Sequence, residues 1–357
     1  TKSGQRTAGA ASKSAGFSWE KGRTKNPADF AVSKIDGEKV VRGPGTLNEQ
    51  FVIEESKNCS IYLLDVMTAV SVDHCENCVV FVGPTESSVF LRNVKNSKFV
   101  IACGQLRTRD CEGCDIALCC RTDPIIETST KMRFACLESG YFDFRRQLQA
   151  ARIPVYCNKW HRLYDFTPNP DPATPNWTLM DREEARNLVD LTDSGIISNE
   201  ESVLRVIPVT LGCRPRPNPE SCMVVFFPAI PNKTTTEADR SSAFELTIEA
   251  FLDVCERNSE VGWDLVDCRV LPLSQEQGKQ IFRNKKWQKR CNGRDALAAV
   301  EICGKEIHRY IEGFLSGPGR LSCPPECVTL IPLERTPEAL KLWFREWKDD
   351  MQGRAIK

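Results

Sequence analysis

The hydrophobic and polar positions of residues 38–131 repeat with a period of about nineteen residues. Each unit holds two short apolar runs, such as 61–64 and 69–72, separated by polar corners. Successive units are 19 residues apart except for the last step of 17, and they begin at Lys39, Asn58, Asn77, Asn96 and Gly113. One unit cannot bury its own apolar face, whereas stacked units share a continuous core. The pattern therefore predicts a parallel β-helix with three short sides per coil.

The repeat places several cysteines in register. Cys59, Cys78 and Cys114 share one position of the coil, and Cys75 and Cys111 share another. Their C-x-x-C spacing is also that of a zinc-binding pair of pairs. The two pairs lie two coils apart, which separates them by about 10 Å. Because Zn–S bonds are only about 2.3 Å long, we favour packing of these thiols in the core, with zinc as the alternative.

The chain on either side of the repeat has a different character. Residues 1–16 are rich in Ser, Ala, Gly and Lys, which is typical of a disordered tail, and the first domain is expected at 17–180. Residues 133–149 have helical character, and the Pro-rich stretch 168–175 predicts an extended strap that covers the solenoid. A charged linker with helical segments is expected at 181–219.

From residue 220 the pattern changes to strands that alternate with helices. The apolar runs that predict strands are 222–227, 263–270 and 296–303. Helical spacing occurs at 244–255, 274–282 and 307–315. Such alternation indicates an α/β sandwich of ferredoxin-like type over residues 220–325.

The last segment, 326–357, is expected to be an amphipathic helix. Thr336 suits the N-cap, Pro337 the first helical position, and Glu338 the positive end of the helix. The side chains that would line one face are Leu340, Trp343, Phe344 and Trp347. We expect this face to dock on the same chain; insertion into a partner's groove is the alternative.

Composition narrows the classes of function. The 357 residues carry 48 Lys and Arg against 48 Asp and Glu, which gives no support to a nucleic-acid surface. No stretch approaches the ~20 apolar residues of a membrane helix. The chain is too long for a small disulfide scaffold, so we expect its 18 cysteines to be reduced, mostly buried thiols in a cytosolic protein. Since the first residue is Thr1, we expect a missing N-terminus, where acylation would attach the protein to a membrane.

The three histidines offer little evidence of catalysis. His74 lies in a corner of the repeat, and His308 lies on a predicted helix without an evident nucleophile beside it. His161 is close to Cys157 in sequence, which makes a weak candidate for a Cys/His pair. The chain has neither a G-x-x-x-x-G-K-[ST] loop nor a G-x-G-x-x-G loop, so nucleotide binding by a standard loop is not supported.

A distinctive charged cluster occupies the second half of the fourth coil. Strand alternation projects Gln105, Arg107 and Arg109 to one side, and Leu106 and Thr108 to the other. The result is a rigid cationic row. A solvated face is the simpler interpretation. The functional one is a contact with a partner's phosphate group, because arginine presents a fixed, always-charged fork. An arginine supplied to a GTPase in trans accelerates hydrolysis by roughly 10³–10⁵.

These features resemble the domain of tubulin-folding cofactor C. The residues that carry the resemblance are the repeat, Cys103-x-Gln105-x-Arg107 and Asp123-Pro124-Ile125-Ile126-Glu127. Further motifs, at 17–19, 163–168, 176–179 and 220–225, are similar to those of the retinitis pigmentosa 2 family, and the likeness covers residues 17–316. It implies a right-handed β-helix followed by a domain resembling nucleoside diphosphate kinase, which is generally inactive in the family. It also implies a GTPase-activating protein for an Arf-like small GTPase that delivers lipidated cargo to cilia.

The resemblance also implies a role for individual residues. Arg107 would be the arginine finger, and Gln105 would support it at the GTPase surface. Glu127 and Phe166 would belong to the same interface. The residues that hold the site in shape would be Arg109 and Asp110. The protein would need no cofactor of its own, because GTP and magnesium belong to the partner, and it would act in the cytoplasm, at the base or axoneme of a cilium or flagellum.

Gly104 departs from the family, which commonly has Gln immediately before the position of Gln105. Either one polar contact is lost or the loop is freer. The departure leaves room for a rival function, a structural or scaffolding role on tubulin or the axoneme without catalysis. A weaker alternative is a pseudo-kinase that senses nucleotide.

Overall fold

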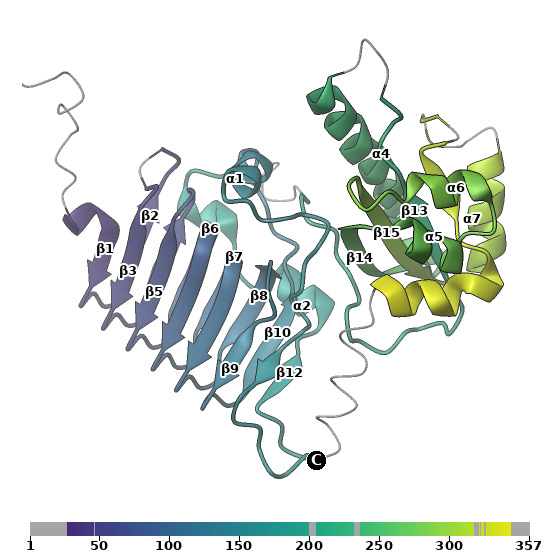
Figure 1. Cartoon of the computed structure of the whole chain (residues 1–357). Helices are drawn as coiled ribbons and strands as arrows, with labels where there is room; N and C mark the ends of the chain where they lie inside the picture. The colour runs from purple at the N-terminus through teal and green to yellow at the C-terminus, as the bar shows by residue number, and fades with distance from the viewer. Residues whose placement is uncertain are drawn as a thin grey trace, which may run out of the picture.

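The computed structural model describes residues 27–45, 47–199, 205–231, 236–317, 321, 323, 324 and 326–343. The predicted N-terminal tail, the motif at 17–19, Phe344 and Trp347 lie outside these residues. Figure 1 shows a solenoid of stacked strands followed by a separate α/β domain. No helix in the described ranges is both long enough and apolar enough to span a membrane.

The predicted parallel β-helix is confirmed as a β-solenoid of about six turns, which forms a 12-stranded sheet. Every pairing in it is parallel, as between Ser60 and Val79 and between Val79 and Lys98. Its strands are β1 (Ala31–Ser33), β2 (Lys39–Arg42), β3 (Gln50–Glu54), β4 (Ser60–Leu63), β5 (Ala69–Asp73), β6 (Val79–Arg92), β7 (Lys98–Arg109), β8 (Asp115–Cys120), β9 (Ile125–Glu127), β10 (Met132–Cys136), β11 (Tyr164–Asp165) and β12 (Trp177–Leu179).

The residues that begin each repeat unit turn the chain at a corner. Asn58, Asn77 and Asn96 have φ angles of 53°, 54° and 48°. This left-handed region is open to Asn and Gly but costly for most other residues, which explains Gly113 at the next corner, with φ of 66°. The amides also stack, since Asn77 Nδ2 donates to Asn58 Oδ1 at 3.3 Å.

The interior of the solenoid contains the cysteine columns. Cys59 and Cys78 donate to the backbone carbonyls of Lys57 and Glu76, at 2.9 and 3.4 Å. Burial raises the pKa of the Cys114 thiol to about 12, so it stays protonated and inert. All 18 cysteines of the chain are free thiols, and most are buried, as predicted.

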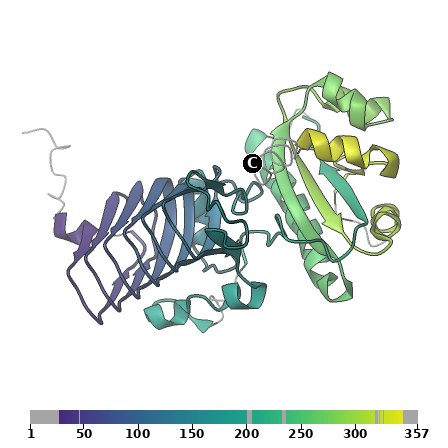
Figure 2. The same cartoon turned by 90° about the horizontal axis from the view of Figure 1, so that it is seen from below.

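One outer side of the solenoid is covered by the chain that follows. The helices involved are α1 (Phe144–Ala150), α2 (Arg182–Arg186) and the 3-10 helix η3 (Leu191–Ser194). Phe144, Leu148 and Leu191 pack there against Tyr62 and Phe81. In Figure 2 the teal segment with α2 runs along this side. Part of the stretch expected to be a linker therefore completes the packing of the solenoid.

Two local predictions were wrong. The helix expected over 133–149 begins only at Phe144, because Met132–Cys136 forms β10 in the next coil. The Pro-rich stretch 168–175 does not cover the solenoid; it is an exposed loop between β11 and β12. Its turns are held locally, since Asn169 Nδ2 donates to the carbonyl of Thr174 at 2.9 Å.

The second domain is a four-stranded antiparallel sheet with the order β14-β15-β13-β16. Its strands are β13 (Ser221–Phe226), β14 (Asp264–Pro272), β15 (Ala296–Cys303) and β16 (Val328–Leu330). Its helices are α4 (Glu237–Arg257), α5 (Gln275–Ile281), α6 (Lys285–Arg290) and α7 (Ile307–Ser316), with the short 3-10 helices η4 (Ser259–Val261) and η5 (Leu333–Arg335). A further 3-10 helix, η2 (Pro27–Phe30), precedes β1 of the solenoid. This order is that of the ferredoxin-like split βαβ arrangement, as predicted.

The C-terminal segment differs from the single helix expected from residue 326. Val328–Leu330 forms β16, and helical residues begin at Thr336, which has αR angles. The Thr336 hydroxyl donates to Pro332 O at 3.3 Å and is not an N-cap. Ala339 and Trp343 pack into the core of the α/β domain, so the described part of this face docks on the same chain.

Candidate functional site

The charged cluster lies on the C-terminal half of β7. Gln105 is half-buried, while Arg107 and Arg109 are exposed. Leu106 and Thr108, which alternate with them, are buried in the solenoid. The predicted division of these side chains between two faces is therefore confirmed, and Arg107 projects from a strand that is hydrogen-bonded on both sides.

Parallel register gives Arg107 apolar neighbours. Phe90 of β6 stands opposite it on one side and Ile125 of β9 on the other. Tyr164 of β11 follows Ile125 in the same row. Within the part of the chain that the structure describes, no hydrogen bond or ion pair involves the Arg107 side chain.

The neighbouring arginines on this face are paired. Arg92 binds Asp73 through two nitrogens, at 2.6 and 2.7 Å, and this carboxylate raises the pKa of Arg92. Arg109 Nε lies 3.3 Å from Asp110 Oδ2. Arg107 thus differs from both in keeping its fork of donors available to a partner.

The corner after β7 is held by hydrogen bonds. Asp110 has a φ of 53°, and its carboxylate accepts from the Thr128 hydroxyl at 2.6 Å. The amide of Thr128 in turn donates to the Thr167 hydroxyl at 2.7 Å. This geometry suits the role that the resemblance implies for Asp110, because it joins three successive coils beside Arg107.

Phe166 completes the surface. This residue is 54% exposed, and its ring lies edge-on to that of Tyr164 with centroids 4.7 Å apart. The Phe166 amide donates to Ile126 O at 2.8 Å, which extends the β9–β11 pairing by one residue. The structure therefore brings together on one face all six residues singled out from the sequence: Gln105, Arg107, Arg109, Asp110, Glu127 and Phe166. We call these six, with Phe90, Ile125 and Tyr164, the candidate surface.

The sequence did not identify the last three as site residues. The signal for Phe90 is the repeat itself, because Phe90 precedes Arg107 by the shortened 17-residue step. Ile125 lies within the Asp123–Glu127 motif. Tyr164 pairs with Ile125, which lies 39 residues earlier in the chain. The period of the repeat does not predict this pairing.

Gly104 and the shortened coil shape this site. Val82 pairs with Ile101 and Ser88 with Gln105, so β7 lacks two residues immediately before Gln105. A Cβ on Gly104 would lie 2.4 Å from Glu86 O, because the previous corner presses on it. The expectation of a freer loop was wrong: Gly104 lies within continuous β7, and its carbonyl accepts from Thr122 N at 3.1 Å.

The histidines lie away from the candidate surface or in structural roles. Burial lowers the pKa of His161 to about 3, and the neighbouring arginines add to this effect. The sulfur of Cys157 accepts a hydrogen bond from Val270 N of β14 at 3.0 Å. His308 Nε2 lies 3.1 Å from Ile331 O on the neighbouring strand end.

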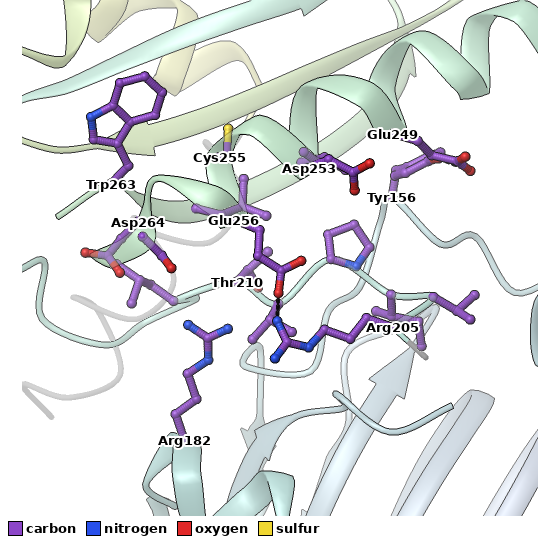
Figure 3. A pocket seen from close by; sticks show the side chains of 18 of the residues that line it. Tyr156, Arg182, Arg205, Thr210, Glu249, Asp253, Cys255, Glu256, Trp263 and Asp264 are labelled. Atoms are coloured by element: carbon purple, nitrogen blue, oxygen red, sulfur yellow. Dashed lines mark hydrogen bonds and ion pairs between the residues drawn. The ribbon is translucent and has the colours of Figure 1, made fainter. Parts of the chain in front are cut away.

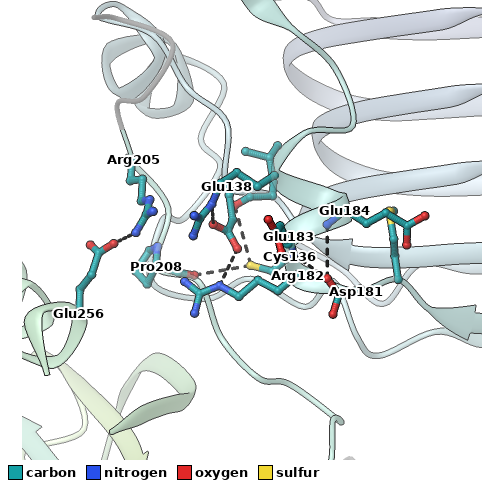
Figure 4. Close-up of polar contacts among 12 residues, drawn as sticks. Cys136, Glu138, Asp181, Arg182, Glu183, Glu184, Arg205, Pro208 and Glu256 are labelled. Carbon is teal, nitrogen blue, oxygen red and sulfur yellow. Dashed lines mark hydrogen bonds and ion pairs between the residues drawn. The ribbon is translucent and has the colours of Figure 1, made fainter. Parts of the chain in front are cut away.

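A cavity of about 280 Å³ lies between the solenoid and the α/β domain (Figure 3). Two ion pairs lie within its lining, Arg145 with Glu249 and Arg205 with Glu256. Arg182 of the lining binds buried Glu138, which lies outside the lining and accepts from Arg182 at 2.8 Å and from Arg186 at 3.2 Å (Figure 4). The cavity is thus lined by both acidic and basic side chains. We interpret it as a junction between the domains and not as a binding site for a ligand of one charge. Among the described residues, no group of three or more His, Cys, Asp or Glu side chains is placed to hold a metal ion.

Comparisons with known proteins show which families this chain resembles. The profile of the family described as Tubulin binding cofactor C matches residues 48–166. Protein XRP2 of Danio rerio is 34% identical over 275 residues, which cover 75% of this chain and 69% of that protein. Tubulin-folding cofactor C of Arabidopsis thaliana is 28% identical over 157 residues, or 44% of this chain and 46% of that protein. The solved Tubulin Binding Cofactor C from Leishmania major is 23% identical, with a TM-score of 0.28, over 41% of this chain and 91% of that chain.

Proposed function

Because the chain belongs to the XRP2 family, we propose that it is a GTPase-activating protein for an Arf-like small GTPase in its GTP state. Arg107 is the arginine finger, supplied in trans, and Gln105 supports it. The protein serves the traffic of lipidated cargo, in the cytoplasm at the base or axoneme of a cilium or flagellum. It completes the partner's active site and needs no cofactor of its own, since GTP and magnesium come with the GTPase.

The observation that carries the proposal is the state of Arg107. It is exposed, has no partner among the described residues, and stands on a strand bonded on both sides. A finger must reach a phosphate without first breaking an ion pair, and it must arrive in one orientation. Neighbouring Arg92 fails the first requirement because Asp73 occupies it.

The rest of the candidate surface supports docking. Phe90, Ile125, Tyr164 and Phe166 surround the finger with apolar and aromatic groups. Aromatic and arginine side chains dominate the binding energy of many interfaces, and apolar neighbours exclude water from the charges between the partners.

Single-turnover GTP hydrolysis tests the proposal. A panel of GTP-loaded Arf-like GTPases is screened first. For the GTPase that responds, Arg107→Ala should abolish a stimulation of roughly 10³–10⁵ and leave the fold intact. Arg92→Ala, one coil away on the same face, is the matched control and should keep most of the stimulation. An unchanged rate in Arg107→Ala would refute the assignment.

A second candidate is a structural role on tubulin. It is favoured by the match to Tubulin binding cofactor C and by the likeness to tubulin-folding cofactors. Microtubule co-sedimentation, together with no stimulation of any GTPase in the panel, would select this function.

A further inference from the structure

The segment 157–167 links the α/β domain to the candidate surface. At its start, Cys157 Sγ accepts from Val270 N at 3.0 Å and lies 3.6 Å from Val270 O, both on β14. At its end, Phe166 stands on the candidate surface. Between them, Asn158 Oδ1 accepts from Cys120 N at 2.9 Å, so the segment is bound to the solenoid as well.

Arg162 fastens this segment to the turn before β9. Its side chain is only 8% exposed, and Nη2 lies 3.3 Å from Asp123 Oδ2. Lys159 Nζ lies 3.4 Å from the other oxygen of the same carboxylate. The next residue of the turn, Pro124, accepts a hydrogen bond from Tyr164 N at 2.8 Å. The ion pair therefore sits directly beside the backbone that places Tyr164.

Arg162 also lies within electrostatic reach of the α/β domain. Asp267 and Arg269 of β14 are both buried and pair at 3.3 Å. Burial raises the pKa of Asp267, while the charges of Arg269 and Arg162 lower it. Burial, together with the charges of both arginines, lowers the pKa of His161 to about 3, so this residue is neutral at neutral pH. The carboxylates of Asp267 and Asp123 thus balance the two buried arginines, Arg269 and Arg162.

We propose that the α/β domain sets the position of Tyr164 and Phe166, and that Arg162 is the positioning residue through which it acts. The inference rests on the proposed function, since it concerns docking at the same surface. Groups at a binding site need support from packed, paired neighbours to hold a productive geometry. Arg107 is carried by β7, between β6 and β9, and does not depend on this segment for its backbone bonds.

Steady-state activation of the cognate GTPase tests the inference. Arg162→Met should raise KM for the GTP-loaded GTPase about tenfold and leave kcat within about twofold, since docking is weakened but the finger remains. Asp123→Asn breaks the same link from its more exposed end and should show the same split. The matched control is Arg145→Met, which removes a different ion pair, the one that Arg145 of α1 makes with Glu249 of α4 at 2.5 Å. A fall in kcat at constant KM, or an equal effect of the control, would overturn the inference.

Two further readouts separate positioning from loss of stability and from failure of the proposed function. Combined with Phe166→Ala, Arg162→Met should add little to the rise in KM, because both changes remove the same contact. Full additivity would count against the inference. In hydrogen exchange of the protein alone, Arg162→Met should speed the amides of Tyr164 and Phe166 about tenfold and leave those of β7 unchanged. This experiment needs no GTPase, so it decides on positioning even if no GTPase responds; unchanged exchange would refute it.

Discussion

Two outer sides of the solenoid differ although they come from the same repeat. The covered side carries outward apolar residues such as Phe81 and Val100, which α1 and η3 bury. The open side carries Gln105, Arg107 and Arg109, and no helix among the described residues covers it. An arginine on the covered side, Arg133, is bound by Asp115 and Glu184, whereas Arg107 on the open side has no partner among the described residues. On one side a charge stabilises the fold, and on the other it is available to another molecule.

The largest effect on stability is expected at the corner that shapes the open side. Gly104→Ala places a Cβ 2.4 Å from Glu86 O and 2.6 Å from Ser87 O, both backbone atoms that cannot rotate away. We expect a loss of about 3 kcal/mol in the free energy of unfolding, measured by urea denaturation. The matched control is Gly313→Ala, in α7, where a Cβ meets nothing within 4 Å. There the greater helix propensity of Ala should stabilise the protein slightly.

A buried charge on the covered side should matter for stability and not for activation. Glu138→Gln removes the carboxylate that holds Arg182 and Arg186 of α2, and its own side chain is 2% exposed. Since both arginines are partly exposed, we expect a loss of about 2 kcal/mol, below the cost of breaking a fully buried pair. Arg107→Ala should change the free energy of unfolding by less than about 0.5 kcal/mol. The contrast between the sides would break down if Arg107→Ala destabilised the fold as much as Glu138→Gln.

The smallest effect concerns pH and the docking of η3. Asp193 accepts from Lys39 and from the Tyr62 hydroxyl, and these bonds lower the pKa of Asp193 below its usual 3.8. A depressed pKa stabilises the folded form above 3.8, and this contribution is lost as the pH falls through the folded-state value. The protection factors of the η3 amides in hydrogen exchange should therefore fall in acid.

Asp193→Asn should remove this dependence, because the amide does not titrate in this range. Asp171→Asn, in the exposed loop between β11 and β12, is the control and should keep it. The acid response of both variants is measured by the protection factors of residues 191–194 in hydrogen exchange above and below pH 3.8. An equal acid response in Asp193→Asn would show that other groups govern the docking of this segment.

Local patterns account for much of what the sequence predicted. The period of nineteen residues was visible because every coil needs the same corners, and Asn at those corners tolerates a positive φ. Alternation along β7 predicted which side chains face outward, since neighbouring residues of a strand point to opposite faces. The continuous apolar run of β8, buried from Ile116 onward, is typical of a strand covered on both faces.

What the sequence by itself determined is thus the solenoid, its inward and outward positions, and the alternation of strands and helices in the second domain. Only the tertiary structure decided which side stays open, that Phe90 and Ile125 flank Arg107, and that Phe166 reaches the same face. It also decided that Gly104 is required by the backbone of the previous coil. The physical reason is separation along the sequence. Periodicity reflects contacts between neighbouring residues and coils, whereas these features depend on pairings between distant segments and on shifts of register between coils.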